Sequence, residues 1–492
     1  MKIKIKLGLL LIIAFVVVVG LFLYNSYNYF NIHENFTSVP LSFNPENSIS
    51  RFDWNGAVVK FQGGFVKGKI IDDNKVENLV LRSLSPIPII ALKGSPDADK
   101  TYYIRVENVN PVNIKVKSTK VDKQEIIDYH TLLIVLNLRR SEDRTVELTP
   151  NTNVGYTEFV ILGDNRNGYQ TFSKIIEQIN AINPVFVVDN GDLVYGGEPN
   201  KYRLFYETVS KLRVPLYTTL GNHDIRESGR PIYTKLFGPP YYSFDYGNGH
   251  FVFLDSSRGW AEKHAISEEQ YIWLENDLKS ASGKRIFVIT HIPPTDPRGT
   301  IEPNKLPDEP GVEKTSFFEK LMNNYSAYKG RDHGFPDRKE AEKFESIMSK
   351  YKVDTVFLSH IHSYFSYIKG NVRYVISGGA GAELLTSDSY YHYLRVKITN
   401  VDHFIEMVQL PSPANTIQDR YIAAIGLFAN SILKEYNTRV IFISSLLVFA
   451  ILWFLYSTRK KWWYFLCFIC GLFIEVLSFA VKRYKERRSG II

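Results

Sequence analysis

Three runs near the chain ends are apolar on every side, whereas a helix in a soluble core normally keeps a polar face. They cover residues 7–24, 440–456 and 462–481. Each is close to the ~20 residues that a helix needs to cross the ~30 Å hydrocarbon core. In chain order, the pattern predicts an N-terminal transmembrane signal anchor, a transmembrane helix, and a transmembrane or re-entrant helix. A connecting helix is expected over residues 420–436.

The first run is interpreted as an uncleaved anchor rather than a cleaved signal peptide. Three lysines precede it, and Tyr24-Asn25-Ser26-Tyr27 does not resemble the small-residue pattern of a cleavage site. With the basic N-terminus in the cytoplasm, the second run returns the chain and places the next basic patch inside. A third full span would put the basic C-terminal tail outside, against the positive-inside rule. The topology of 462–481 therefore stays open.

Residues 40–150 alternate apolar and polar side chains with a period of two. The clearest runs are 57–61, 102–106, 112–117 and 132–138, with clusters of Gly, Asp, Asn and Pro between them. Several short strands without helical periodicity are typical of a β-sandwich. We expect an all-β sandwich accessory domain that acts as a spacer or binding module, because the segment contains no catalytic constellation.

From about residue 157 the pattern changes to apolar strands that alternate with helical segments. The predicted strands are 159–162, 185–188, 216–220, 241–246, 251–254, 286–289, 355–358 and 372–376, and the predicted helices are 170–182, 199–213 and 268–278. Ser267 and Gln270 form a candidate capping box at the start of the last helix. Strands that are apolar on both faces favour an α/β sandwich with helices on the outside.

Composition and charge exclude several classes of protein. With 45% hydrophobic and 22% charged residues among 492, the chain is neither disordered nor fibrous. Of its net charge of +8, the first six residues carry +3 and the residues from Arg459 onward carry +6, which leaves −1 for the rest. A nucleic-acid surface is therefore not expected. The positive charge flanks the apolar runs, where it orients the chain and meets anionic lipid headgroups.

Polar residues directly follow five of the predicted strands. They are Asp164, Asp192, Asn222-His223-Asp224, His291 and His360-Ile361-His362. Because the carboxyl ends of strands in an open α/β sheet face the ligand crevice, we expect these side chains to converge. One such residue alone would be typical of a helix cap or a structural histidine, but five in order predict a metal site. This mixed set of oxygen and nitrogen ligands exceeds the needs of one zinc ion and fits two ions with a bridging carboxylate.

The ordered set resembles the calcineurin-like metallophosphoesterase superfamily over roughly residues 157–410. Segments 242–246, 270–274 and 377–381 are similar to that family as well. The resemblance implies a metallophosphoesterase-type four-layer α/β/β/α sandwich as the catalytic domain.

One departure points to a branch of this superfamily. Most members begin with Asp-x-His, but Arg166 stands at the third position here. Purple acid phosphatases also lack that histidine, and Gly191-Asp192-Leu-Val-Tyr195 and Val288-Ile-Thr-His291 are similar to their second and fourth motifs.

Position by position, the resemblance implies two metal sites that share one carboxylate. One ion would be held by Asp164, Asp192, Tyr195 and His362, and the other by Asp192, Asn222, His291 and His360. A phenolate ligand would favour ferric iron; otherwise a pair of divalent or mixed-valence Fe, Mn or Zn ions is open. Because Ser359 and Asn165-Arg166 depart from the purple enzymes, an ordinary surface aromatic remains the alternative for Tyr195.

The expected mechanism follows from charge. Two cations offset the repulsion between a phosphate ester and a metal-bound water or hydroxide. His223 resembles the family histidine that protonates the leaving group or stabilises its charge, with Asp224 orienting the ring; packing against the loop is the alternative. Arg166 is expected to contact phosphate as a bidentate donor, or else to be a surface salt-bridge partner.

Residues 293–345 form a long insertion rich in Pro, Gly, Lys and Asp between two ligand-bearing strands. Long loops at such positions are often lids. Arg331, His333 and Arg338 are candidates for contact with substrate, and solvated loop positions are the alternative.

The sequence therefore predicts a membrane-anchored hydrolase of phosphate mono- or diesters whose catalytic domain is extracytoplasmic. Its expected partners are a phosphate ester and the lipid bilayer, and protein partners stay open. A lipid-linked phosphate or diphosphate is the alternative substrate, motivated by the clustered apolar runs and by Glu475 within one of them. A surface binding or structural protein with a degenerate metal site is the alternative of another class.

Overall fold

The computed structural model describes residues 36–118, 120–151, 155–227, 229–257, 264–281, 283–298, 333–384, 389–414 and 417–435. Described residues up to Ser431 belong to one compact unit. The three predicted membrane spans lie outside the described residues. In the part of the chain that is described, no helix is long and apolar enough to cross a membrane.

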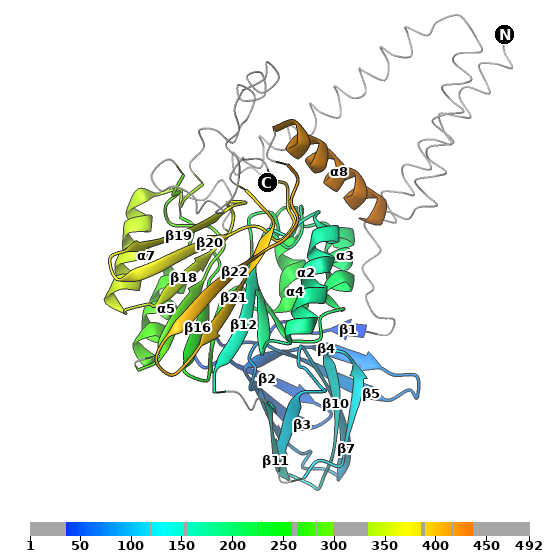
Figure 1. Ribbon diagram of the computed structural model, residues 1–492. Coiled ribbons are helices and arrows are strands. Elements are labelled where there is room, and N and C mark those ends of the chain that lie inside the picture. The colour runs from blue at the N-terminus through cyan, green and yellow to red at the C-terminus, as the bar shows by residue number, and fades with distance from the viewer. Residues whose placement is uncertain are drawn as a thin grey trace, which may run out of the picture. The chain divides into compact units, whose positions relative to one another are not determined.

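Among the described residues before 151 there are eleven strands, which Figure 1 shows in blue and cyan. Their bounds are β1 Phe36–Ser38, β2 Ile49–Trp54, β3 Ala57–Gln62, β4 Gly64–Ile71, β5 Glu77–Ser83, β6 Ile89–Lys93, β7 Lys100–Glu107, β8 Ile114–Ser118, β9 Lys123–Asp128, β10 Thr131–Leu138 and β11 Asp143–Pro150. One sheet has the order β1-β4-β5-β7-β10-β9 and the other β2-β3-β6-β11-β8. Alternate residues such as Tyr102, Ile104 and Val106 of β7 are buried in one apolar cluster, because successive side chains of a strand point to opposite faces. A domain boundary at residue 150 stays a prediction.

Contacts tie these strands to the rest of the unit. The side chain of Asn108 accepts a hydrogen bond from the backbone N–H of Leu216 at 2.8 Å and donates one to its carbonyl at 2.9 Å. The side-chain amide of Asn108 therefore satisfies both backbone groups of Leu216, as a neighbouring strand would. Buried Lys67 contacts Glu107 at 2.7 Å and donates to the hydroxyl of Tyr206 at 3.2 Å.

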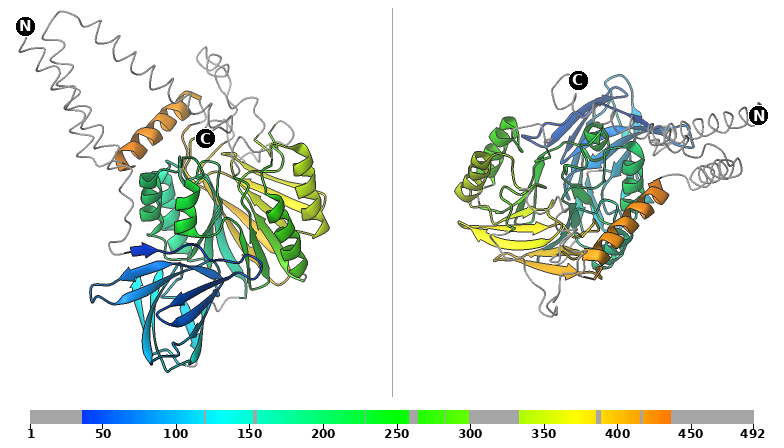
Figure 2. Two further views of the ribbon diagram at one scale, coloured as in Figure 1. Left: turned by 180° about the vertical axis from the view of Figure 1, so that it is seen from behind. Right: turned by 90° about the horizontal axis from the view of Figure 1, so that it is seen from above.

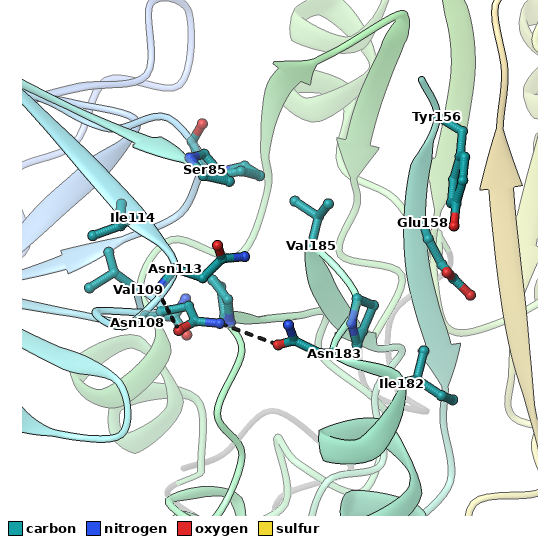
Figure 3. A pocket seen from close by; sticks show the side chains of 15 residues that line it. Ser85, Asn108, Val109, Asn113, Ile114, Tyr156, Glu158, Ile182, Asn183 and Val185 are labelled. Carbon is teal, nitrogen blue, oxygen red and sulfur yellow. Dashed lines mark hydrogen bonds between the residues drawn. The ribbon is translucent and has the colours of Figure 1, made fainter. Parts of the chain in front are cut away.

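A pocket of about 210 Å³ lies at this junction (Figure 3). Asn110 donates a hydrogen bond across it to Asn183 at 3.4 Å. The one carboxylate among its described lining residues is Glu158, which is paired with Arg395 at 2.7 Å. The described lining includes neither histidine nor cysteine, and its one carboxylate is paired, so it does not form a metal-ligand set.

In the described ranges from residue 157 onward the chain forms two more sheets and six helices. The strands are β12 Thr157–Leu162, β13 Phe186–Asp189, β14 Leu216–Thr218, β15 Tyr242–Tyr246, β16 Gly249–Phe253, β17 Arg285–Ile289, β18 Thr355–Leu358, β19 Tyr364–Lys369, β20 Val372–Ser377, β21 His392–Ile398 and β22 His403–Gln409. The helices are α2 Tyr169–Ile182, α3 Pro199–Val209, α4 Gly229–Phe237, α5 Glu268–Ser280, α7 Arg338–Lys350 and α8 Ile417–Glu435. The sheet orders are β14-β13-β12-β21-β22 and β15-β16-β17-β18-β20-β19.

The two sheets pack face to face with helices on their outer faces (Figures 1 and 2). An aromatic cluster fills the space between them, in which Phe159 stacks on Phe186 at 5.1 Å and meets Phe251 edge-on at 5.4 Å. A second apolar cluster joins α2, α3 and α4 to the first sheet, and a third joins α5 and α7 to the second. The result is a mixed α/β fold whose strands are buried on both faces.

Several elements differ from the sequence prediction. Strands β19, β21 and β22 and helix α4 were not predicted. The segment 293–345 is not a loop throughout, because α7 begins at Arg338, where Asp337 caps it by accepting from the N–H of Lys339 at 2.9 Å. Residues 299–332 of that segment lie outside the described residues.

The predicted capping box at α5 is only half formed. The hydroxyl of Ser267 accepts from the N–H of Gln270 at 3.2 Å, as in an N-cap. The side chain of Gln270 instead bonds the backbone of Asp255, accepting at 2.7 Å and donating at 2.9 Å. A glutamine that closes a capping box would bond the backbone N–H of the cap residue.

His250 on β16 lies between two carboxylates. Its Nδ1 contacts Asp245 at 2.8 Å and its Nε2 contacts Asp277 at 2.9 Å, while Lys284 also pairs with Asp245. Burial alone would lower the pKa of His250, but hydrogen bonds to the two aspartates outweigh burial and raise it to about 9. The imidazolium therefore stabilises the fold most below about pH 6.5, and this contribution disappears as pH rises through about 9.

We expect His250→Gln to destabilise the chain by on the order of 2 kcal/mol near pH 6 and by much less above pH 9. The measurement is the melting temperature of the full-length wild-type and variant proteins in detergent across this pH range. A difference that stays constant between pH 6 and pH 10 would contradict a charged His250.

Candidate metal centre

Three of the predicted ligands follow neighbouring parallel strands of the first sheet. Asp164 comes after β12, Asp192 after β13 and Asn222 after β14. β12 pairs in parallel with β13, and β13 with β14, so their carboxyl ends lie at one edge. The N–H of His223, next to Asn222, donates to Oδ1 of Asp192 at 2.9 Å.

The second sheet supplies the three histidines. His291 follows β17, and His360 and His362 follow β18, which is parallel to β17. The backbone N–H of His360 donates to Oδ2 of Asp164 at 2.8 Å, which joins the loop edges of the two sheets.

Two groups of donor atoms result, and both contain Asp192. One comprises Asp192, His291 and His360, and the other comprises Asp164, Asp192 and His362. Within each group the donor atoms lie within 4.8 Å of one another. Nε2 of His291 lies 3.3 Å from Oδ1 of Asp192, and Nε2 of His362 lies 3.5 Å from Oδ1 of Asp164.

Several of these donor atoms are buried without a hydrogen-bond partner among the described residues: Oδ1 of Asp164, Oδ1 of Asn222 and Nε2 of His291. A buried acceptor without a partner costs about 1–3 kcal/mol. Their oxygen and nitrogen chemistry matches the ligands that Fe, Mn and Zn take. The residues therefore fit metal ions at both groups.

Backbone carbonyls fix the orientation of two ligand rings. Nδ1 of His291 donates to the carbonyl of Asn190 at 2.7 Å, and Nδ1 of His362 donates to the carbonyl of Glu383 at 2.6 Å. Each bond leaves Nε2 as the nitrogen with a free lone pair, which is the usual arrangement around a ligating histidine.

The backbone at three ligands has the left-handed conformation that non-glycine residues rarely adopt. The φ angles are 58° at Asp164, 56° at Asp192 and 70° at His360. Such residues cost of order 1–3 kcal/mol each and cluster at functional sites. The fold therefore gives up stability to turn these side chains toward one another.

Burial and charge act in opposite directions on the pKa of Asp192 and in the same direction on the pKa of Asp189. Burial raises the pKa of Asp192, but His223, His291 and Arg166 outweigh burial and hold it well below the usual range. Burial and the nearby carboxylate of Asp224 raise the pKa of Asp189 well above its usual range.

The ring of His223 is oriented by a backbone carbonyl rather than by Asp224, contrary to the sequence prediction. Its Nδ1 donates to the carbonyl of Tyr195 at 2.7 Å. Asp224 instead accepts from the N–H groups of Asp192 and Val194 at 3.0 Å each and of Gly221 at 2.8 Å. The carboxylate therefore braces the ligand loops, because backbone donors already occupy its oxygens.

Arg226 contacts the remaining nitrogen of that ring. It donates to Nε2 of His223 at 2.8 Å. Burial lowers the pKa of His223 to about 2 against the influence of Asp192, and Arg166 and Arg226 add to this effect. The ring is therefore neutral, with its lone pair on Nε2.

Arg166 is buried, with 4% of its side chain exposed, so it is not the surface salt-bridge partner of the alternative prediction. Its NH2 donates to Glu383 at 2.9 Å and lies 3.3 Å from Nε2 of His362. Its NH1 lies 3.6 Å from Oδ2 of Asp192. The guanidinium therefore sits directly beside the carboxylate that both groups share.

Tyr195 lies at the rim of this arrangement and is half-buried. Its ring centroid is 5.1 Å from that of His223 and 4.8 Å from that of Phe428 of α8. Three cations surround the ring, since Arg166, Lys201 and Arg226 lie 5.4–5.8 Å from its centroid. Ligation of a metal by Tyr195 stays a prediction.

The comparisons with known proteins agree with this geometry. Residues 157–364 match the family model of the calcineurin-like phosphoesterases. The chain contains a calcineurin-like phosphoesterase domain. The resemblance inferred from the sequence is thereby confirmed.

Relatives of the phosphoesterase domain include phosphodiesterases and phosphatases. The chain is 29% identical over 170 residues to the glycerophosphodiester phosphodiesterase GpdQ of Enterobacter lignolyticus, covering 33% of this chain and 61% of that protein. It is 25% identical over 298 residues to probable inactive purple acid phosphatase 24 of Arabidopsis thaliana, covering 48% and 43%. The chain thus spans about half the length of these curated relatives.

Among solved structures, the purple acid phosphatase PPD1 from yellow lupin seeds is similar to this chain. The match has a TM-score of 0.39 and 14% identity, and it covers 74% of this chain and 78% of that one.

Of the three candidate substrate contacts in the insertion, the structure describes two, His333 and Arg338. The ring of His333 lies 5.1 Å from that of His360, so it neighbours the metal centre. Arg338 is on α7, almost fully exposed and paired with Glu342 at 3.3 Å, so it points into solvent. Arg331 lies outside the described residues.

Three site residues were missed by the sequence prediction. Glu383 pairs with Arg166 and its carbonyl orients His362, and the carbonyl of Asn190 orients His291. Arg226 is two positions after Asp224 of the Asn222-His223-Asp224 motif, and this proximity could have indicated that it belongs to the site. Asn190 and Glu383 orient the histidines through their backbone carbonyls, and a residue type does not reveal such a role.

The close approach of the loops carrying Asp192 and Asn222 requires glycine at position 221. A Cβ there would lie 2.1 Å from the backbone nitrogen of Asp192. We expect Gly221→Ala to displace Asp192 and to lower the metal content of the purified full-length chain, with α/β secondary structure retained. Elemental analysis and circular dichroism measure the two effects.

Gly155→Ala is the matched control, because a Cβ at residue 155 would meet nothing within 4 Å. Equal metal content in both variants and the wild type would contradict the packing argument.

Proposed function

We propose that this chain is a membrane-anchored phosphoesterase that hydrolyses phosphate mono- or diesters at a dinuclear metal centre. The observation that carries the proposal is the presence of Asp192 in both donor groups. A carboxylate shared by two sites is what a two-ion centre needs. The phosphodiesterase name of the relative GpdQ supports this reaction class.

The residues of the two groups would hold the ions. Asp164, Asp192 and His362 would hold one ion, with Tyr195 as the untested fourth ligand; His291, His360 and Asn222 would hold the other together with Asp192. Fe, Mn and Zn all suit such ligands. The bound ions would supply the positive charge that offsets the charge of the phosphate and of the attacking group.

His223 would handle the proton of the leaving group through one nitrogen. Because Nδ1–H is committed to the carbonyl of Tyr195, only Nε2 can exchange a proton with substrate, and Nε2, which holds the lone pair, would have to take up a proton before it could give one to the leaving group. Nε2 lies 3.9 Å from Oδ2 of Asp192, so this proton would move beside the shared carboxylate.

The phosphate would be held by Arg226, with Arg166 as the more constrained second cation. Arg226 has no ion pair with a carboxylate among the described residues, and its hydrogen bond to neutral His223 is easily exchanged for an anion. Arg166 is already paired with Glu383. Arg226 is therefore the cation with more capacity for a charged ligand.

The membrane part of the proposal rests on residues outside the described ranges. The apolar runs 7–24, 440–456 and 462–481 and their basic flanks support anchoring, with the phosphoesterase domain on the extracytoplasmic side. A lipid-linked phosphate or diphosphate is the second candidate substrate. It is favoured by Phe428 of α8, which lies next to Tyr195, and by the exposed apolar residues Ile422 and Ile425 of the same helix.

The reaction is tested on the full-length chain in detergent with aryl phosphate monoesters, aryl phosphate diesters and lipid phosphates, under loading with Fe, Mn or Zn. We expect Asp192→Asn to lose both turnover and bound metal. We expect His223→Ala to lose turnover by roughly 100-fold or more with metal retained, because it removes a proton donor or charge stabiliser.

Wild-type rates in both Asp192→Asn and His223→Ala would contradict the proposed mechanism. No bound metal and no turnover under any loading would favour a binding or structural protein with a degenerate site. Turnover of lipid phosphates alone would select the second candidate.

We expect Arg226→Ala to reduce kcat/KM roughly 10- to 100-fold and to weaken inhibition by inorganic phosphate, because a charge-assisted hydrogen bond to the anion is lost. Arg226→Lys should recover part of the phosphate inhibition. Arg213→Ala, an exposed arginine beside Tyr129, is the matched control. Equal phosphate inhibition in Arg226→Ala and the control would contradict this role.

A further inference from the structure

Helix α8 has an inner face that contacts the loops of the metal centre. Arg420, Ala424 and Ser431 on this face are buried. The hydroxyl of Ser431 donates to Oδ1 of Asn167, in the loop between Arg166 and α2, at 2.8 Å. The same helix brings Phe428 against Tyr195. The inner face therefore fixes α8 beside the site.

The outer face of α8 is apolar and exposed. Ile422 is 60% exposed and Ile425 68%, and Gly426 and Ala429 are exposed too. Ile422, Ile425 and Ala429 are three and four positions apart, so they lie along one side of the helix. Figures 1 and 2 show α8, in brown and orange, along the side of the domain formed by α2 and α3.

This helix is not itself a membrane span. It carries Asp419, Arg420, Lys434 and Glu435, and no helix in the described ranges is apolar enough to cross a bilayer. An amphipathic helix with one apolar face and charged ends is typical of a helix that lies in the plane of the membrane interface.

The sequence after α8 limits how far from this helix a bilayer could lie. The helix ends at Glu435, and the apolar run 440–456 begins five residues later. At about 3.6 Å per residue the connection reaches less than about 20 Å. A bilayer entered by 440–456 would therefore lie within about 20 Å of the end of α8.

We propose that the outer face of α8 lies in the headgroup region of the bilayer that residues 440–456 enter, so that the Tyr195 side of the metal centre opens next to lipid headgroups. This inference rests on the membrane anchoring proposed above. It extends that proposal by naming the surface that meets the lipid. It also gives phosphate esters at the membrane surface the shortest route to the site.

The test uses the full-length chain in nanodiscs of phosphatidylcholine and phosphatidylglycerol. The two native cysteines are removed with Cys467→Ser and Cys470→Ser, and one cysteine is introduced as Ile425→Cys and labelled with an environment-sensitive fluorophore. Ile422→Cys is a second probe of the same face. Ile368→Cys is the matched control, because Ile368 is 69% exposed on β19, away from α8.

We expect a blue-shifted emission maximum at positions 422 and 425 and loss of most of their fluorescence to doxyl-labelled lipids. Position 368 should show water-like emission without quenching. Metal content equal to the wild type shows that the labelled chains are folded.

Three results would overturn the inference. Water-like emission at 422 and 425 in nanodisc-bound chain would place α8 away from lipid while leaving the anchoring intact. Blue-shifted emission without doxyl quenching would show that protein, such as a second copy or another segment of this chain, covers the face. Chain that does not remain in the nanodisc would remove the anchoring proposal and the inference with it.

Discussion

The burial of several carboxylates in one place is the constraint on which the rest of the structure depends. Asp164, Asp189, Asp192 and Asp224 are all buried at the carboxyl edge of the sheet that contains β12, β13 and β14. Like charges at this spacing oppose folding unless protons, hydrogen bonds or cations compensate them. Three backbone N–H groups donate to Asp224 and the guanidinium of Arg166 lies beside Asp192, while burial and the carboxylate of Asp224 raise the pKa of Asp189. Donor atoms that remain without partners mark where metal ions would complete the compensation.

The architecture supplies the rigidity that such a cluster needs. A tightly packed aromatic core between the sheets holds two parallel strand edges together, and the ligand loops leave these edges at fixed points. Left-handed backbone at Asp164, Asp192 and His360 is tolerated because hydrogen bonds across the loops determine their conformation. Metal affinity and stability are therefore coupled, since the same loops carry both the strain and the ligands.

Much of this arrangement was predictable because it depends on local patterns. A buried parallel strand reads as a short apolar run, and a polar residue directly after it lies at the functional edge of the sheet. Asp192 and His291 could be assigned in this way. Asp224 could not, because a carboxylate in an Asn-His-Asp motif serves equally well to orient a ring or to brace a loop. Its three backbone partners come from residues up to 32 positions away.

By itself, the sequence determined many of the strands and helices after residue 157 and the candidate ligands, because these follow from periodicity and spacing along the chain, and its motifs showed the resemblance to the family. Only the tertiary structure decided which atoms meet. It placed Arg226 on His223, Glu383 on Arg166 and Phe428 of α8 on Tyr195, all of which are contacts set by packing. Residues that are distant in sequence become neighbours through the closure of two sheets on one core. Neither the residue types nor the local sequence pattern indicates that these side chains lie close together in the fold.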